Sequence, residues 1–301
     1  MRSLLVPVIA ALLCITGTGF VSGGVVPCAH RSVAAEPAQD LPGSPAADPV
    51  PAVAQQAPVE DDSTVAAGAW QAIRATLPDS RVGFEVFDRT SGTVLASQGA
   101  DQQFAAMSVV KLLVALDLLA EGGSPDPVTQ QELRQMLASS DDQIADGLWT
   151  EGGGGAIVSR VAARLGLTGT QPPEDPGQWG DTQITPGDLV TVYRYIAEHL
   201  PAPDRDLVLG ALAAAPRTAA DGFDQYFGIP DGMPNTGWAI KQGWGTSGSD
   251  AVMNSTGLVG PDLRYVVVVL VSAPANSYSE LPAVVTTGAA ALAGLVAPTA
   301  P

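Results

Sequence analysis

Ser108 and Lys111 have the residue types and the spacing of a nucleophile with its own base. On a helix, residues three apart lie on one face, one turn from each other, so the amine can reach the hydroxyl. A hydroxyl becomes a nucleophile when a base takes its proton, and an amine in apolar surroundings has a lowered pKa. The pair therefore indicates nucleophilic catalysis. The alternative is that Ser108 only caps a helix, since Ser-x-x-Lys is a short pattern that also occurs by chance.

Two further segments carry polar groups that could serve such a site. The chain has only two lysines, and the second, Lys241, ends an apolar strand segment just before Gly243 and Gly245, which allow close backbone approach. The other segment is Ser139-Ser140-Asp141-Asp142-Gln143. Each also has an ordinary structural interpretation: a solvated lysine at a strand end and a capped helix start.

The elements that must position these residues follow from periodicity. From Val109 to Ala120 the chain is apolar on every face except at Lys111 and Asp117, which predicts a buried helix. Alternating or β-branched runs predict five strands, and capping signals and Pro positions predict the helices. The predicted strands are 81–88, 94–97, 238–242, 251–259 and 263–272. The other predicted helices are 63–77, 126–138, 141–149, 156–165, 185–199, 204–215 and 279–295, with a loop over 219–235.

Strands at both ends with helices between them predict an α+β fold: an antiparallel five-stranded sheet flanked by N- and C-terminal helices, with an all-α lobe inserted. We expect three regions, namely a leader over 1–35, a Pro/Ala-rich disordered linker over 36–62 and a folded domain over 63–301. Within the domain, the α/β part would comprise 63–100 and 236–301 and the helical lobe 101–235. A cleft between sheet and lobe would hold the site.

The leader is typical of an exported protein. An apolar run from Leu4 to Val26 follows Arg2, and the small residues 33–35 suit cleavage. The run is also long enough for an uncleaved membrane anchor. Bulky Leu13 before Cys14 argues against lipid attachment. We expect the protein to be secreted, in the cell wall or on the outer face of the cytoplasmic membrane, with a membrane tether as one alternative.

Composition excludes some partners and cofactors. A net charge of −17 argues against binding nucleic acid through a basic surface. Of the two cysteines, Cys28 would be lost with the leader, so no thiolate metal site or disulfide is expected. Nothing indicates a metal or an organic cofactor, and we expect a monomer. A Ser-His-Asp mechanism is disfavoured, because one histidine lies in the leader and the other, His199, is expected at a helix end.

In their order, the three segments resemble the active-site set of the serine β-lactamase and penicillin-binding-protein superfamily, Ser-x-x-Lys, Ser-Asp-Asn and Lys-Thr-Gly. The matching positions here are Ser108 to Lys111, Ser140 to Asp142 and Lys241 to Gly243. The predicted element order is similar to that fold over residues 63–297, and Thr185-Pro186 is similar to the start of a helix in the family.

The resemblance implies a role for each matching residue. Ser108 would be the acylated nucleophile, Lys111 its base and Ser140 the proton relay, while Lys241 would hold the relay hydroxyl and the substrate carboxylate. The backbone N–H groups of Ser108 and Trp244 would form an oxyanion hole. Substrate-binding or oxyanion positions would be Asp142, Gln242, Gly243 and Trp244. The other tryptophans, Trp149, Trp179 and Trp238, could also line a substrate groove, but aromatic residues are more often core.

Three departures from the family pattern bear on activity. Asp142 replaces an Asn and could keep Lys111 protonated, and Gln242 replaces a Thr hydroxyl. The glutamate with which β-lactamases activate the deacylating water has no counterpart, since Glu174 lacks its Glu-x-x-x-Asn setting. The resemblance therefore implies an exported acyl-transferring serine hydrolase on amides or esters, such as small molecules or peptidoglycan peptides in a D,D-peptidase manner. The alternatives are a weakly active or inactive binding module with the same fold and a true β-lactamase.

Overall fold

A computed structural model of the chain describes residues 64–120 and 125–296. The predicted leader and linker lie outside the described residues, as does Ser63 at the predicted start of the first helix. In the described part, strands from the two ends of the domain enclose a block of helices, in the order that the sequence predicts.

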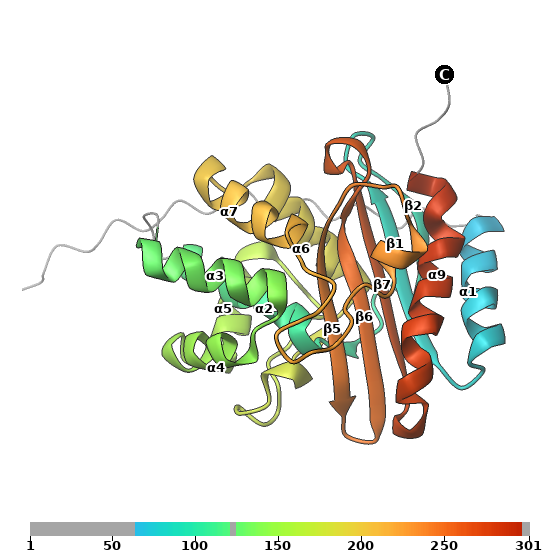
Figure 1. Cartoon of the computed structure of the whole chain (residues 1–301), viewed down its shortest axis with the longest axis horizontal. Coiled ribbons are helices and arrows are strands. Elements are labelled where there is room, and N and C mark those ends of the chain that lie inside the picture. The colour runs from blue at the N-terminus through green and yellow to red at the C-terminus, as the bar shows by residue number, and fades with distance from the viewer. Residues whose placement is uncertain (1–63, 121–124, 297–301) are drawn as a thin grey trace, which may run out of the picture. The chain divides into compact units, whose positions relative to one another are not determined.

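One antiparallel sheet joins the two ends of the domain (Figure 1). Its strand order is β2-β1-β7-β6-β5. The strands are β1 (Arg81–Asp88), β2 (Thr93–Gln98), β5 (Trp238–Ser247), β6 (Asp250–Val259) and β7 (Tyr265–Pro274). Strands β1 and β7, from opposite ends of the domain, pair in a register that extends from Arg81↔Ser272 to Asp88↔Tyr265. The predicted five-stranded antiparallel sheet is confirmed, and β5 forms one of its edges.

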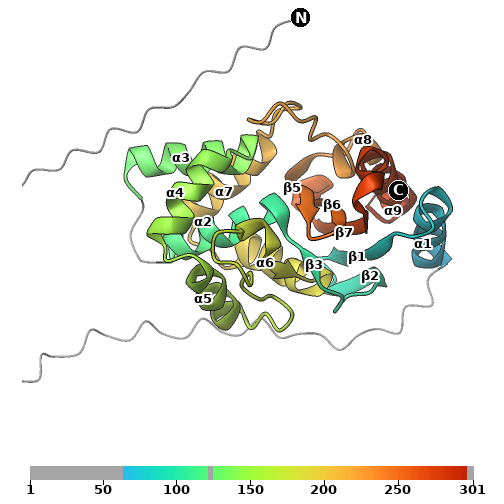
Figure 2. The same cartoon turned by 90° about the horizontal axis from the view of Figure 1, so that it is seen from below.

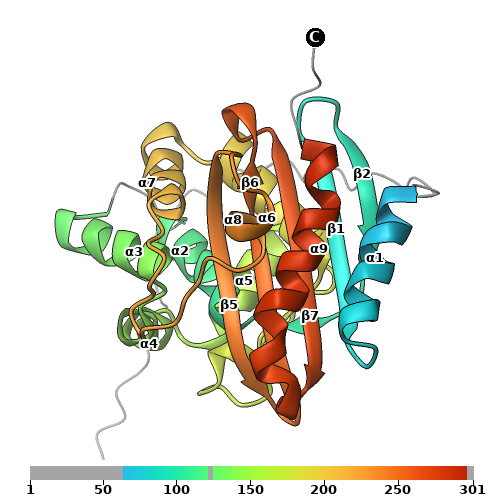
Figure 3. The same cartoon turned by 45° about the vertical axis from the view of Figure 1, so that its right-hand side comes forward.

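Two helices cover one face of the sheet. In Figure 3, α9 (Leu281–Val296) lies across β6 and β7, with α1 (Thr64–Thr76) beside it. A methyl group at Gly288 of α9 would lie 2.5 Å from Ile73 of α1, so the two helices meet closely. The segment Ala275–Val296, with mean hydropathy 1.4, is long and apolar enough to cross a membrane. Its buried residues instead pack against α1 and the sheet, as expected of a core helix.

The other face meets the helical lobe (Figure 2). Its helices are α2 (Lys111–Leu119), α3 (Pro127–Ser139), α4 (Asp142–Glu151), α5 (Gly155–Leu165), α6 (Pro186–Glu198) and α7 (Ala202–Ala213). Side-chain caps followed by proline start α3 at Asp126 and α6 at Thr185. Helix α2 lies at the centre of the lobe, where eight of its nine residues are buried.

The structure adds short elements that the sequence pattern did not predict. Strands β3 (Phe104–Ala105) and β4 (Gln183–Ile184) pair with each other, and helix α8 (Ile229–Gly232) lies within the predicted loop. Two residues are too few to show an alternating pattern. Strand β5 continues past its predicted end at Gln242 to Ser247, and this extension passes beside the candidate site.

Candidate active site

Ser108 lies on a short 3₁₀ helix, η1 (Met107–Val110), that leads directly into α2 at Lys111. The Lys111 Nζ atom donates a hydrogen bond to Ser108 Oγ at 2.7 Å, so the expected reach of the amine to the hydroxyl is present. Met107, just before the serine, has φ +48°, a left-handed conformation that is strained for methionine. The turn therefore presents the hydroxyl from a strained backbone.

The sheet holds this turn in place. Asn254 of β6 donates from Nδ2 to the carbonyl oxygens of Ala105 at 2.9 Å and Ala106 at 3.1 Å. Opposite Asn254, Gly243 of β5 lies so close to the turn that an added Cβ would be 2.7 Å from the Ala106 oxygen. Glycine is required here for close approach, as the sequence predicts, and Gly243 acts through its lack of a side chain.

Lys111 is fully buried and makes four polar contacts. Besides Ser108 Oγ, Nζ donates to Ser140 O at 3.0 Å, to Ser140 Oγ at 3.4 Å and to Asp142 Oδ1 at 2.5 Å. It also lies 4.7 Å from the centre of the Trp179 ring. Burial lowers the pKa of Lys111, and the Asp142 carboxylate opposes this by favouring the ammonium form. The contact expected between Asp142 and Lys111 is therefore present.

Ser140 connects the two lysines. Its hydroxyl accepts a hydrogen bond from Lys241 Nζ at 2.8 Å as well as the longer one from Lys111. The alternative interpretation of this segment as a capped helix start holds for Asp141 but not for the two serines before it. Ser140 ends α3 with φ +60°, and Asp141 caps α4 by accepting from Ile144 N at 3.1 Å. The Ser140 hydroxyl is thus available to the lysines.

Lys241 lies behind the site rather than on its surface. Its side chain is 1% exposed, and Nζ donates to Ser140 Oγ and to Gln242 O at 3.2 Å. Among the described residues, no carboxylate forms an ion pair with it. Burial lowers its pKa well below the usual value, and the charge of nearby Lys111 lowers it further.

Gln242 does not face the site, contrary to its predicted substrate-binding role. Successive side chains on a strand point to opposite faces, so Gln242 points away from the side to which Lys241 points. Its Nε2 donates to the carbonyl oxygens of Gln225 at 3.1 Å and Phe227 at 2.6 Å. Gln242 therefore anchors the loop between α7 and α8 to β5.

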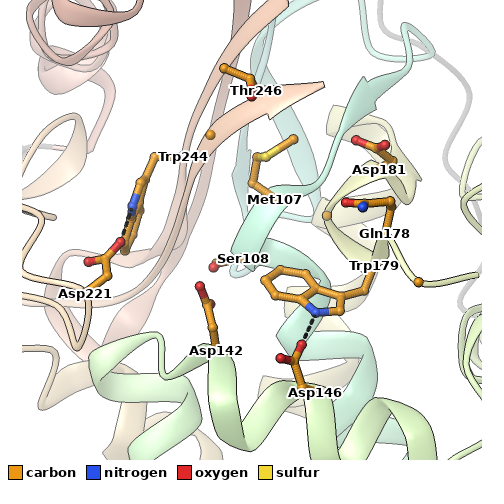
Figure 4. Close-up of a pocket in the computed structure, with 13 residues that line it drawn as sticks. Met107, Ser108, Asp142, Asp146, Gln178, Trp179, Asp181, Asp221, Trp244 and Thr246 are labelled. Atoms are coloured by element: carbon orange, nitrogen blue, oxygen red, sulfur yellow. Dashed lines mark hydrogen bonds between the residues drawn. The ribbon is translucent and has the colours of Figure 1, made fainter. Parts of the chain in front are cut away.

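A cavity of about 490 Å³ opens beside Ser108 (Figure 4). It is lined by Met107, Ser108, Asp142, Asp146, Gly177, Gln178, Trp179, Gly180, Asp181, Asp221, Trp244, Gly245 and Thr246. Of the predicted residues, Ser108, Asp142 and Trp244 are in this lining. The other three predicted catalytic residues are outside the lining, behind Ser108. They are connected to it by hydrogen bonds, from Lys111 to Ser108 and from both lysines to Ser140.

Two indoles form opposite walls of the cavity, and each is held by an aspartate. Figure 4 shows Trp244 on one side of Ser108 and Trp179 on the other. Trp244 Nε1 donates to Asp221 at 2.9 Å, and Trp179 Nε1 donates to Asp146 at 2.7 Å. The position of Trp244 in the cleft is as predicted, and of the two alternatives for Trp179, groove or core, the groove is the one that holds. No sequence signal marked Asp146 or Asp221, which come from a helix face and an irregular loop.

The remaining predicted features lie away from the cavity. Glu174 is exposed and outside the lining, so it does not serve as the missing glutamate. His199 ends α6 and is exposed, as predicted. Trp149 is buried, as predicted, and donates to Pro176 O. Among the described residues, no group of three or more His, Cys, Asp or Glu is arranged to hold a metal ion.

No protein-family model matches the chain. It is similar to proteins named "Putative lipoprotein LppW" from Mycobacterium bovis and Mycobacterium tuberculosis H37Rv, with 40% identity over 199 residues in each case. The matched region covers 64% of this chain and 63% of each relative, so the chain spans less than two thirds of the length of these relatives.

The fold is similar to that of several solved structures. A β-lactamase from Chitinophaga pinensis matches with a TM-score of 0.65 at 15% identity, covering 77% of this chain and 99% of that one. A β-lactamase from Streptomyces albus G matches with a TM-score of 0.59 at 21% identity, covering 78% of this chain and 100% of that one. PBP-A matches with a TM-score of 0.59 at 20% identity, covering 75% of this chain and 94% of that one. With the strand order and the helical lobe described above, these likenesses show that the chain has the fold of the serine β-lactamase and penicillin-binding-protein superfamily.

Proposed function

We propose that the protein is a serine hydrolase that cleaves amides or esters through an acyl-enzyme on Ser108. One observation carries the proposal: a buried lysine amine 2.7 Å from Ser108 Oγ, in a chain with only two lysines, both of which contact Ser140. Burying two amines against one hydroxyl is costly. A lysine with a purely structural role does not need this arrangement, so the pair of lysines favours catalysis.

The residues suggest the following sequence of steps. Neutral Lys111 accepts the Ser108 proton as Oγ bonds to the substrate carbonyl carbon. The proton passes through the Ser140 hydroxyl to the leaving amine or alcohol, and the bond between carbonyl carbon and leaving group breaks. Water then cleaves the acyl ester, which restores Ser108 and releases the acid. Lys241 polarises and orients the Ser140 hydroxyl at 2.8 Å.

The backbone N–H groups of Ser108 and Trp244 are the proposed oxyanion donors. In an antiparallel pair, hydrogen-bonded and non-hydrogen-bonded positions alternate. Counted from the tight turn at Ser247↔Asp250, Trp244↔Met253 is a non-hydrogen-bonded position. Because β5 is an edge strand, we expect the Trp244 N–H to point outward from the sheet, free to donate to a substrate oxygen. The close contact of Gly243 with Ala106 and Met107 brings the Ser108 turn next to this part of β5.

Deacylation is expected to be slow. The loop beside Ser108 presents Trp179, whose ring lies over the Lys111 amine, and none of the described residues lining the cavity is a glutamate. A water molecule attacking the acyl ester would have to rely on Lys111, which Asp142 holds in an ion pair. The protein is therefore proposed as a slow acyl-transferring enzyme of D,D-peptidase or penicillin-binding type rather than an efficient β-lactamase.

We further propose that the enzyme works outside the cytoplasmic membrane as a monomer, on small molecules or peptidoglycan peptides and not on nucleic acid. The predicted leader and the lipoprotein name of the relatives support export, and that name also supports a membrane tether. A binding module without turnover is the second candidate. It is favoured by the ion pair between Lys111 and Asp142, because an amine held as ammonium cannot act as a base.

The first experiment is acylation followed by intact-mass and peptide mass spectrometry. The protein is incubated with a fluorescent penicillin and, separately, with an activated aryl ester. We expect one adduct on Ser108 that Ser108→Ala and Lys111→Ala both abolish, while exposed Ser249→Ala retains it. An adduct that persists in Ser108→Ala, or no adduct with either reagent, contradicts the hydrolase proposal. Adduct without release of product, even after long incubation, would favour the binding module.

A further inference from the structure

We propose that this site takes acyl substrates whose side chain ends in a primary ammonium group, bound between two indoles and four aspartates. The inference rests on the proposed function and adds the charge of its substrate. It concerns the acyl side chain, a different part of the substrate from the carboxylate that the resemblance to the superfamily assigns to Lys241.

The first support is the charge of the cavity. Its lining contains four aspartates, and no Lys, Arg or His is among the described lining residues. These are Asp142, Asp146, Asp181 and Asp221. A carboxylate entering this cavity would meet like charges on several sides, whereas an ammonium would be attracted at long range and bound at short range.

The second support is that the nearby cations are already engaged. The Lys111 amine contacts Ser108, Ser140 and Asp142, and Lys241 is buried behind Ser140. Arg217, on the loop that carries Asp221, forms ion pairs with Asp224 at 2.9 Å and Asp231 at 2.8 Å and is outside the lining. None of these groups offers a free positive charge in the cavity lining to a carboxylate on the acyl side chain.

The third support is the pair of aromatic walls. Each indole N–H donates to a carboxylate, which leaves the ring face richer in electrons and therefore more attractive to a cation. Within the site, the Lys111 Nζ atom lies 4.7 Å from the Trp179 ring centre, so this ring already packs against an amine. Phe223 stacks on Trp244 at 5.0 Å and an interplanar angle of 13°, which fixes the second wall. Aromatic faces and carboxylates together are typical of ammonium recognition.

The test compares three esters of one leaving group on Nα-acetylated amino acids: lysine, Nε-acetyl-lysine and glutamate. Acylation of Ser108 is timed by mass spectrometry. We expect the lysine ester to react about tenfold faster than its neutral Nε-acetyl analogue, and the glutamate ester to react more slowly than both. The preference should shrink at 1 M salt, where charges are screened over about 3 Å. Equal rates for the three esters, or a faster glutamate ester, would overturn the inference while leaving the hydrolase proposal intact.

A double variant tests the aspartates directly. Asp146→Asn with Asp221→Asn keeps an oxygen for each indole N–H but removes two charges, so the lysine ester should lose most of its advantage over the neutral ester. The matched control is Asp206→Asn, an exposed aspartate outside this cavity, which should retain the full preference. A double variant that keeps the preference would show that these carboxylates do not set it.

Binding without chemistry separates this inference from the proposed function. The Ser108→Ala protein is titrated with the corresponding Nα-acetyl amides, and quenching of Trp179 and Trp244 fluorescence reports occupancy. Preference for the lysine amide here, without acylation of the unmodified protein, would support the cationic ligand and refute the hydrolase. Acylation with no charge preference in either assay would support the hydrolase and refute the cationic ligand.

Discussion

The Lys111 amine lies between two oxygens that call for opposite protonation states, 2.7 Å from the Ser108 hydroxyl and 2.5 Å from the Asp142 carboxylate. The first contact needs a neutral amine to accept a proton, whereas the second favours the ammonium form. Burial shifts the pKa of Lys111 downward and Asp142 shifts it upward. The competition between them sets the fraction of protein that is ready to react.

Asp142→Asn should make acylation faster at neutral pH. The substitution removes the carboxylate that raises the pKa of Lys111, so the acidic limb of the pH–rate profile should move to lower pH and the rate at pH 7 should rise several-fold. Stopped-flow acylation by an activated ester between pH 5 and 10 measures this, with Asp206→Asn as the surface control. A limb that stays in place or moves to higher pH would show that Asp142 does not govern the base.

Lys241→Met should stabilise the protein and impair acylation. The pKa of Lys241 is lowered by burial, so at neutral pH the unfolded chain binds a proton that the folded state disfavours. This cost is largest at pH values below the folded-state pKa and shrinks to zero as the pH rises towards the lysine's normal value. Replacing the lysine by an apolar side chain should add about 1 to 3 kcal/mol to the free energy of unfolding at pH 7. Urea unfolding at pH 7 and pH 10 should show the gain shrinking at the higher pH, and a loss of stability at pH 7 would refute this account.

Gly243→Ala should displace the nucleophile turn. The new methyl would lie 2.7 Å from Ala106 O and 3.1 Å from Met107 Cβ, so either β5 or the turn must move. We expect a loss of about 1 to 3 kcal/mol in the free energy of unfolding and acylation slower by about 10- to 100-fold. Gly237→Ala, where nothing lies within 4 Å of the added methyl, is the matched control. Equal behaviour of the two variants would show that the close approach at Gly243 has no role in positioning Ser108.

Glu85→Gln should stabilise the fold above neutral pH. Glu85 lies on β1 and is 7% exposed, and burial raises its pKa from 4.5 to about 7, although Ser97 donates to it. The folded state holds this proton more tightly than the unfolded chain, so the stability of the unmodified protein falls as the pH rises from 4.5 to about 7 and then levels off. The advantage of the variant should grow over that window to about 3 kcal/mol.

The measurement is the free energy of unfolding of both proteins at pH 4.5, 6 and 8. Exposed Glu280→Gln should show no such growth. An advantage of Glu85→Gln that is independent of pH would mean that Glu85 does not titrate in this range.

Local pattern alone was enough to predict the framework and the buried chemistry. Alternation identified β1 and a run of β-branched residues identified β7, and these two strands pair across the two ends of the domain. The apolar surroundings of Lys111 and its spacing from Ser108 predicted the 2.7 Å contact, because helix geometry converts sequence spacing into distance. Lys241 could be selected because lysine is so rare in this chain.

The tertiary structure decided which side chains face the cavity and what charge it carries. The sequence placed Gln242 beside the site, but the pleat of β5 turns it to the opposite face, where the loop carbonyls bind it. Trp179 and Asp221 come from irregular segments whose path depends on packing against η1 and β5 and not on local periodicity. Spacing along the chain determines distances only within one regular element, so the acidic, aromatic character of this cavity emerges only when separate segments are packed together.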